Sequence, residues 1–352
     1  MGGDWPACAQ DNCTGACVGD VTRCLAHAGV KERDAVLRQF SKTGSLDVRG
    51  VTISDALFKE ILDAAPLDAD GHWTFSAARF NGATFRGEAS FTNATFEGGA
   101  WFTDATFEGD AGFDKAKFRG EASFEWTTFE GSAWFGKAKF RGEASFHEAT
   151  FGSQGGKKGG AWFTDATFGG NAEFDGARFG HNASFEDATF EGDALFHGAR
   201  FKGTVMLARA TFEVGAWFGE ATFERDANAR FDGARFEGEA GFAGATFEAG
   251  ARFAEATFNG NASFAGRRLR AMRLIWMERN SLRRPKSRQI LKCLLAAEDG
   301  SWAGFGLTCA VRTFVWTTRT CPCRRCLPAP PTPVGVENAL NCSLFSEPMS
   351  QD

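Results

Sequence analysis

The sequence predicts an all-β solenoid between residues 75 and 264, a right-handed coil of short parallel strands around a phenylalanine core. All 33 Phe in this region share one register, in which the step between neighbours is mostly five and six residues in alternation. The register is interrupted only by an insertion after Phe151, by Leu207 in one Phe place and by a two-residue slip before Phe231. The residue two positions before each register place is Ala at 31 of 34 places, Trp73, Thr127 and Val205 being the exceptions.

The repeat reads Phe-x-Gly-x-Ala-x-Phe-x-x-Ala-x, with a period of eleven residues. Because side chains alternate between the two faces of a strand, Ala and Phe point to the same side. Units of five or six residues are too short for a hairpin and suit one side of a coil that keeps turning the same way. Parallel crossovers are overwhelmingly right-handed, so we expect a right-handed coil.

Stacked coils about 4.8 Å apart would place Phe over Phe at a spacing that aromatic rings favour. The inward Ala must be small because Phe fills the interior. The Gly that follows Phe is expected to relieve the corner, where we expect a positive φ.

Four sides per coil would require two periods of eleven, or twenty-two in all. The segment KAKFRGEASFEWTTF at residues 115–129 recurs two periods later, as KAKFRGEASFHEATF at residues 137–151. A second copied segment, AWFTDATF at Ala100 and Ala161, fits a multiple of one period but not of two once the insertion is removed. The coil of two periods, with eight or nine coils in all, is therefore a hypothesis that the sequence leaves open.

The unit Ala-x-Phe-x-x resembles the pentapeptide-repeat family, closest to its Phe-rich bacterial branch. This resemblance covers more than half of the chain and implies a right-handed quadrilateral β-helix. The sequence departs from the family pattern by one extra residue in alternate units, which puts a strictly square cross-section in question.

Residues 31–74 are expected to form a helical N-terminal cap, because an open coil end exposes apolar core and backbone. Lys31–Phe40 is typical of a short helix, and Leu46–Ile53 alternates like a strand that could form the first rung. Ser54 is a suitable N-cap for a second helix through Ala65, which Pro66 would end.

Residues 1–30 form a Cys/His-rich segment in which Cys8, Cys13, Cys24 and His27 are candidate ligands of a structural zinc ion. Zinc prefers four thiolate or imidazole ligands in a tetrahedron, commonly supplied as close pairs. Cys17 is a spare or substitute ligand, and the alternative is a set of free, partly buried thiols. The arrangement of Trp, Cys and the Arg-Cys-Leu-Ala-His motif also resembles segments that precede the repeats in related bacterial proteins.

Residues 265–352 form a basic tail that contains Cys and Pro and is expected to be helical or poorly ordered. Residues 267–284 are a candidate basic amphipathic helix, and residues 327–336 are Pro-rich. The three Cys between residues 321 and 326 lack a convincing fourth metal ligand. The abrupt change of composition also suggests translation out of the ancestral reading frame, which further repeats in another frame of the gene would support.

Charge is distributed unevenly, with 7 basic and 11 acidic residues in 1–74, 18 and 27 in 75–264, and 14 and 6 in 265–352. The start of the chain lacks a secretory signal and no run of 18 apolar residues occurs, so we expect a cytoplasmic protein without a transmembrane segment.

The sequence presents no catalytic constellation and no cofactor-binding motif, so the protein is not expected to be an enzyme. Its five His do not form a recognisable triad with Ser, Cys or Asp. The glycine-rich insertion at residues 152–160 lacks the spacing of a phosphate-binding loop and is interpreted as a loop bulging from one coil.

The expected function is a rigid scaffold that binds an unknown protein partner. The family resemblance implies an alternative, in which an acidic β-helix mimics DNA and occupies the DNA site of a type II topoisomerase such as gyrase. Basic residues interrupt the acidic ones, as in Arg-Gly-Glu at Arg86, Arg119 and Arg141, and this counts against mimicry. Direct nucleic-acid binding by the repeat is not expected, and the oligomeric state is left open.

Overall fold

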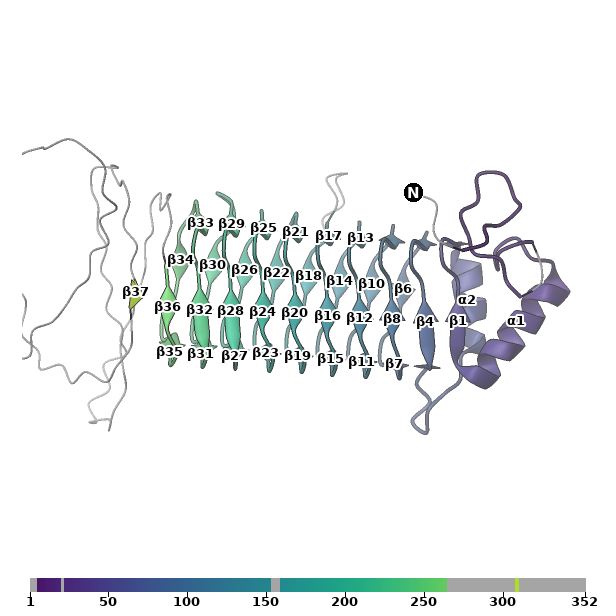
Figure 1. The fold of residues 1–352 in the computed structure, drawn as a ribbon, viewed down its shortest axis with the longest axis horizontal. Coiled ribbons are helices and arrows are strands. Elements are labelled where there is room, and N and C mark those ends of the chain that lie inside the picture. Colours follow the sequence, from purple (N-terminus) through teal and green to yellow (C-terminus); the bar gives the residue numbers. More distant parts are fainter. Residues whose placement is uncertain (1–4, 20–21, 153–158, 265–307, 310–352) are drawn as a thin grey trace, which may run out of the picture.

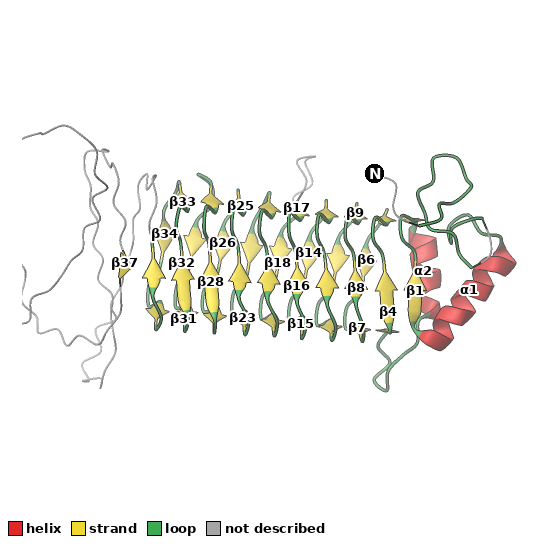
Figure 2. Cartoon of the chain, in the orientation of Figure 1, coloured by secondary structure: helices red, strands yellow, loops and turns green. Residues whose placement is uncertain are grey.

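The computed structural model describes residues 5–19, 22–152, 159–264 and 308–309, and these form a long parallel β-solenoid with two helices at its N-terminal end (Figure 1). Helices α1 (Val30–Thr43) and α2 (Asp55–Ala64) lie together at that end, and short strands joined by turns and loops make up the rest (Figure 2). The predictions for the tail segments 267–284, 321–326 and 327–336 fall outside the described residues.

Four parallel sheets form the sides of the solenoid, each taking one strand from every coil. We name the faces after the strands of one coil, β3 to β6. The β3 face contains β3 (Thr74–Phe75), β7 (Thr95–Phe96), β11 (Lys117–Phe118), β15 (Lys139–Phe140), β19 (Thr167–Phe168), β23 (Thr189–Phe190), β27 (Thr211–Phe212), β31 (Arg235–Phe236) and β35 (Thr257–Phe258). The β5 face, two sides further round the coil, contains β2 (Thr52–Ile53), β5 (Thr84–Phe85), β9 (Thr106–Phe107), β13 (Thr128–Phe129), β17 (Thr150–Phe151), β21 (Arg178–Phe179), β25 (Arg200–Phe201), β29 (Thr222–Phe223) and β33 (Thr246–Phe247).

The other two sides are the β4 face and the β6 face. The β4 face contains β1 (Ser45–Asp47), β4 (Ala77–Arg79), β8 (Ala100–Trp101), β12 (Ala122–Ser123), β16 (Ala144–Ser145), β20 (Ala172–Glu173), β24 (Ala194–Leu195), β28 (Gly215–Trp217), β32 (Glu239–Gly241) and β36 (Ala262–Ser263), with β37 (Thr308–Cys309) antiparallel to β36. The β6 face contains β6 (Ala89–Ser90), β10 (Ala111–Gly112), β14 (Ala133–Trp134), β18 (Ala161–Trp162), β22 (Ala183–Ser184), β26 (Val205–Met206), β30 (Ala229–Arg230) and β34 (Ala251–Arg252).

The strand register confirms the coil of two eleven-residue periods. Phe118 pairs with Phe140, and hydrogen bonds between equivalent positions of neighbouring coils span a sequence offset of 22. Across the insertion the offset grows to 28, as in the pairing of Phe151 with Phe179. Across the two-residue slip it is 24, as in the pairing of Phe212 with Phe236, and Phe remains paired with Phe in both places. The two AWFTDATF segments lie on different faces, β8 on the β4 face and β18 on the β6 face, which explains why they fit one period but not two.

The core consists of four columns of Phe that run along the solenoid axis. Phe102 lies between Phe80 and Phe124 at ring-centroid distances of 4.9 Å each, with interplanar angles of 6° and 1°. These Phe and the inward Ala are almost wholly buried. Each buried ring contributes about 1.5–3 kcal/mol through removal of apolar surface from water, and the offset stacking adds to this.

The expectation of positive φ at the Gly after Phe was wrong for most coils, Gly152 at φ 74° being an exception. The left-handed conformation falls instead on the residue just before Ala in the Phe-x-x-Ala corner, for example Asp104 at φ 58° and Glu148 at φ 52°. In that corner Ala105 N–H donates to the carbonyl of Phe102 at 2.9 Å, and the positive φ at the third residue is that of a type II turn.

The Gly of the Phe-x-Gly corner lies where successive coils touch. A Cβ on Gly120 would lie 2.7 Å from the carbonyl carbon and oxygen of Gly98 in the preceding coil, and a Cβ on Gly192 would lie 2.6 Å from those of Gly170. Close contact between coils, and not backbone conformation, therefore favours Gly at this corner, although His181 and Val214 occupy the equivalent position in two of the coils.

The two helices cover the N-terminal end of the core, as predicted. Phe40 of α1 stacks on Phe75 at 5.7 Å, and Phe58 of α2 packs edge-on against Phe91 at 5.2 Å. The Ser54 side chain accepts from Leu57 N–H at the start of α2. The predicted rung at Leu46–Ile53 is present as β1 and β2 on two different faces, which pair with β4 and β5.

We predict that Gly120→Ala lowers the free energy of unfolding by about 1–3 kcal/mol, because the added methyl group forces two coils apart. Gly198→Ala is the matched control, because Gly198 has φ 65° and a Cβ there would meet nothing within 4 Å. In the Gly198→Ala variant, the left-handed backbone strain of the new Ala lowers the free energy of unfolding by about 1–2 kcal/mol. The variant's less flexible unfolded chain offsets about 0.4–1 kcal/mol of this loss.

The measurement is thermal and guanidinium unfolding of both full-length variants, followed by circular dichroism. Equal destabilisation by the two substitutions would contradict the steric role of Gly120. It would mean that a methyl group at Gly120 costs no more than one at Gly198, where the space is open.

Candidate functional site

The four predicted ligands Cys8, Cys13, Cys24 and His27 lie together in the segment that precedes α1, beside the first coil. Their ligand atoms all lie within 4.8 Å of one another. The separations are 3.5 Å from Cys8 Sγ to His27 Nδ1, 3.7 Å from Cys13 Sγ to Cys24 Sγ and 3.4 Å from Cys24 Sγ to His27 Nδ1. We call this group the Cys/His cluster.

Two short pieces of backbone position these side chains. A hairpin brings Cys8 and Cys13 into place, with Cys8 N–H donating to Gly15 carbonyl at 2.8 Å and an isolated bridge between Ala7 and Ala16. A helical turn then presents Cys24 and His27 on one side, with His27 N–H donating to Cys24 carbonyl at 3.0 Å. The spare thiol of Cys17 turns away and donates to Ala7 carbonyl at 3.2 Å.

The dimensions of the cluster suit a tetrahedral ion. Ligands bound at 2.0–2.3 Å to tetrahedral zinc lie about 3.3–3.8 Å apart, which is the range of the three separations above. Three thiolates and one imidazole are a donor set that favours zinc over the hard cations that prefer oxygen. The residues therefore fit a metal ion, and with four protein ligands they leave no open position for substrate.

Burial works to raise the pKa of both buried thiols of the cluster, Cys8 and Cys24. It raises the pKa of Cys24 to about 12, and the neighbouring Cys13 adds to this. Burial also acts to raise the pKa of Cys8, but hydrogen bonds with the backbone of Cys24 and Gln10 and with His27 outweigh it and lower this pKa to about 6.

The cluster is joined to the first coil of the solenoid. Ala16 N–H donates to Arg49 carbonyl at 2.7 Å, and Thr14 Oγ1 donates to Gly50 carbonyl at 3.0 Å. The Arg49 guanidinium lies 5.0 Å from the Trp5 ring centroid, in cation–π geometry. A Cβ on Gly15 would lie 2.8 Å from Cys24 Cβ, so the hairpin and the cysteine turn pack tightly against each other.

A second group of side chains that could hold a metal ion, Asp68, Asp70 and His72, was not predicted from the sequence. A turn in the backbone explains why these residues lie together. Asp68 Oδ1 accepts from the backbone N–H groups of Asp70 and His72 at 2.9 Å each. These hydrogen bonds lower the pKa of Asp68. The group therefore fixes the loop before β3, which accounts for it without a ligand.

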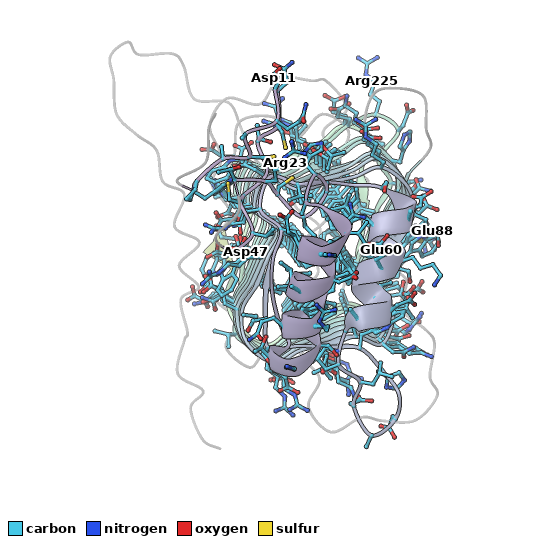
Figure 3. All side chains as sticks on the ribbon, turned by 90° about the vertical axis from the view of Figure 1, so that its right-hand side faces the viewer. Asp11, Arg23, Asp47, Glu60, Glu88 and Arg225 are labelled. Atoms are coloured by element: carbon cyan, nitrogen blue, oxygen red, sulfur yellow. The ribbon has the colours of Figure 1, made fainter. Side chains whose placement is uncertain are left out.

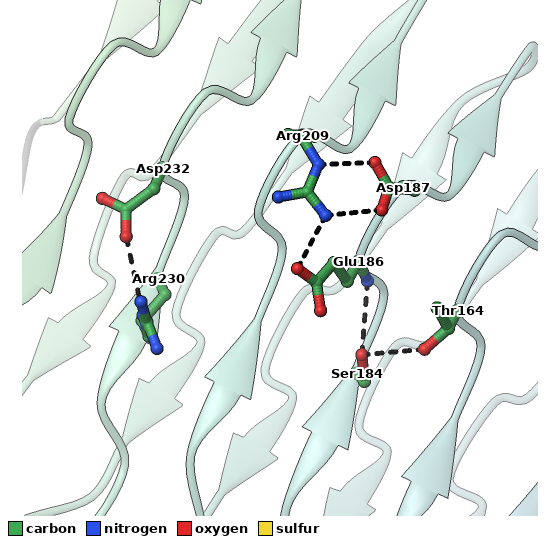
Figure 4. A network of polar contacts seen from close by, with 7 residues as sticks. All are labelled: Thr164, Ser184, Glu186, Asp187, Arg209, Arg230 and Asp232. Atoms are coloured by element: carbon green, nitrogen blue, oxygen red, sulfur yellow. Dashed lines mark hydrogen bonds and ion pairs between the residues drawn. The ribbon is translucent and has the colours of Figure 1, made fainter.

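The outer surface of the solenoid carries the remaining polar chemistry. Viewed along the axis, charged side chains project outward around the whole perimeter, with Glu88 and Arg225 among those labelled (Figure 3). Some are neutralised between coils: Arg209 bonds Asp187 at 2.6 Å and Glu186 at 2.8 Å, beside the hydrogen bond that joins Ser184 and Thr164 (Figure 4).

Exposed or half-buried Trp side chains lie on the strands of two opposite faces, the β4 face and the β6 face, a feature that the repeat analysis did not single out. Trp134 and Trp162 stack on neighbouring coils of the β6 face, with ring centroids 5.5 Å apart. A Cβ on Gly160 would lie 2.9 Å from Trp162, so the ring covers the glycine of its own coil. The sequence signal was present, since Gly precedes Trp by two residues at Trp101, Trp162 and Trp217.

A shallow depression of about 490 Å³ lies at the two-residue slip before Phe231, between the β5 and β6 faces. It is lined by Gly180, His181, Asn182, Lys202, Gly203, Glu224, Arg225, Asp226 and Glu248. Arg225 is 3.7 Å from Glu248. No Ser, Thr or Cys nucleophile is among these lining residues, so the depression does not assemble a nucleophile with a base.

None of the helices within the described residues is long and apolar enough to cross a membrane.

Comparison with known proteins bears on the repeat itself. The family model described as pentapeptide repeats (9 copies) matches residues 72–117, 105–150, 158–200, 185–228 and 226–266. No curated protein and no solved structure matches the chain. The matched segments cover more than half of the sequence and coincide with the four-sided parallel coil, and on this evidence the chain belongs to the pentapeptide-repeat family.

Proposed function

We propose that the protein is a non-enzymatic scaffold whose rigid outer faces bind a protein partner. The observation that carries this proposal is the contrast between the two sides of each strand. Inward positions are Phe or Ala almost throughout, whereas outward positions of one face change from Thr95 to Lys117 to Thr167 along the axis. Folding constrains the inward set far more closely than the outward set, where it uses mainly some Asp and Asn that accept backbone N–H bonds from the next coil, as Asn171 does from Asp193 N–H. Much of the outward pattern is therefore available for recognition.

The rigidity of the coils suits such a role. Backbone hydrogen bonds join coil to coil at the corners as well as in the strands, for example from Asp104 N–H to Glu125 carbonyl at 2.9 Å. A surface held in this way loses little entropy on binding, which favours affinity.

We predict that charge reversal on one face of the solenoid abolishes partner capture while the same change on the opposite face does not. The bait is the full-length chain in a native lysate, and captured proteins are quantified by mass spectrometry. A partner that is lost from one face-directed variant only supports the scaffold. Capture profiles that are identical for all faces, or no stoichiometric partner for any of them, would count against it.

DNA mimicry directed at gyrase receives less support from the outer surface. A mimic needs a continuous row of carboxylates in place of phosphates, but the column at one corner reads Glu97, Arg119, Arg141, Gly169 and Glu191 along the axis. Arg119 also neutralises Glu97 directly, at 2.8 Å.

We therefore expect no inhibition of gyrase-catalysed DNA supercoiling by the purified protein, even at a large molar excess. The assay is a standard plasmid supercoiling reaction with a known gyrase inhibitor as positive control. Inhibition that survives in high salt would overturn this expectation and favour mimicry.

For the Cys/His cluster we propose a structural zinc ion held by Cys8, Cys13, Cys24 and His27. Support comes from the ligand separations, from the donor set and from the contacts to Arg49 and Gly50. Such an ion would join the hairpin, the cysteine turn and the first coil, where the apolar core is small. Small domains commonly use a metal in this way.

We predict one zinc ion per chain in protein purified without chelators, measured by elemental mass spectrometry. Cys24→Ser should remove the zinc and lower the thermal unfolding midpoint of the N-terminal end, because metal binding contributes folding free energy. Cys17→Ser is the matched control and should retain it, since the Cys17 thiol donates to a backbone carbonyl outside the cluster. Equal zinc content in both variants would rule out this ligand set.

A further inference from the structure

The copied KAKFR segments create a concentrated positive surface on an otherwise acidic solenoid. Strands β11 and β15 are neighbours in the β3 face, and Lys117 lies directly opposite Lys139. The two segments therefore stack into three columns of two, with all six side chains exposed. We call this surface the basic patch, consisting of Lys115, Lys117, Arg119, Lys137, Lys139 and Arg141.

The cations of the basic patch are mostly left without carboxylate partners. Arg119 pairs with Glu97 at 2.8 Å, whereas the other five form no ion pair within the part of the chain that the structure describes. Elsewhere on the solenoid some basic side chains are paired, as Arg178 is with Glu148 at 2.9 Å and Arg209 with Asp187 at 2.6 Å. Single cations such as Arg86 and Arg235 also form no ion pair among the described residues, but they do not stack in adjacent columns as the basic patch does.

This arrangement works against folding. Like charges directly opposite each other on neighbouring strands are destabilising, and coils about 4.8 Å apart hold Lys117 over Lys139. The patch gathers a third of the basic residues of the region 75–264, although acidic residues outnumber basic ones there. A bound anion would relieve the repulsion, so the patch is suited to a negatively charged ligand.

The size and borders of the patch favour a short anionic ligand over a long one. Its three columns span at most about 13 Å across and its two rows about 5 Å along the axis. The coils on either side continue the column of Lys115 and Lys137 with Asn93 and Asp165, and Glu121 and Glu143 lie just beyond the arginines. A nucleic acid running across the patch would meet these carboxylates, whereas a short segment would not.

An extended peptide matches the spacing. Outward positions two residues apart along the coil are at most about 6.6 Å apart, and the turn at Lys115, with φ 58°, shortens this interval on one side. An extended peptide with acidic residues at alternate positions presents carboxylates at a similar interval. Exposed Trp134, three residues before Lys137 on the neighbouring β6 face, adds an aromatic surface at the edge of the patch. Aromatic and basic side chains together are typical of binding surfaces.

We propose that the basic patch docks a short, extended acidic segment of the partner protein. This inference rests on the proposed scaffold function and adds the chemistry of the partner and the face that receives it.

The test uses the full-length protein and a fluorescein-labelled peptide of twelve residues, in which a central Glu-Ser-Glu-Ser-Glu, about 13 Å long between its outer carboxylates, is flanked by neutral Gly and Ser. Binding is followed by fluorescence anisotropy at 50 mM and 200 mM salt. The patch variant is Lys117→Glu with Lys139→Glu. The matched control is Arg178→Glu with Arg200→Glu, which makes the same charge change on two adjacent coils of the opposite β5 face. Circular dichroism checks that both variants fold.

We expect the patch variant to weaken peptide binding at least tenfold and the control variant to weaken it less than twofold. Equal losses in both variants, or no binding by the wild-type protein at 50 mM salt, would overturn the proposal. A twelve-nucleotide single-stranded DNA bound more tightly than the peptide, and lost in the patch variant, would overturn it in favour of nucleic acid. If the patch variant still captures the lysate partner normally, the scaffold function stands and only the docking site fails.

Discussion

The close stacking of successive coils is the constraint on which the rest of this structure depends. Parallel pairing fixes the coils about 4.8 Å apart. At this distance Phe rings stack in register, as Phe118 does on Phe140 at 4.6 Å. The same distance leaves no room for a Cβ where Gly120 meets Gly98. It also places outward side chains in columns, so that neighbouring coils either neutralise each other or accumulate charge.

The extra residue in alternate units is explained by two kinds of corner. The five-residue step turns at Phe-x-x-Ala, through a residue with positive φ such as Asp104. The six-residue step turns at Phe-x-Gly-x-Ala, where the Gly rests on the coil before it. The two corners alternate around each coil, so corners of the same kind lie diagonally opposite. This symmetry gives each coil two periods of eleven and keeps the four Phe columns regular.

The fold was largely predictable from the sequence because its determinants are local and repeated. Register, core residues, both capping helices and the Ser54 cap follow from spacing and residue type. The corner conformation was not predictable in the same way: Gly suggests positive φ, whereas the deciding contact at Gly120 is with a residue one whole coil earlier. The Cys/His cluster was predictable only in part. Residue types suggested Cys8, Cys13, Cys24 and His27, but excluding Cys17 required knowing that its thiol turns toward Ala7 carbonyl.

The separation of inward from outward residues also explains how function can be added to such a fold. Replacing Thr by Lys at an outward strand position leaves the core unchanged, as the pairing of Thr95 with Lys117 and of Lys139 with Thr167 shows. The cost is electrostatic alone, and it grows when two copies of a basic segment stack. Duplicating one coil's sequence therefore doubles the charge on one face without disturbing the fold. Duplication of a coil sequence that carries basic residues therefore lengthens the core and, in the same step, creates a charged surface that can bind a partner.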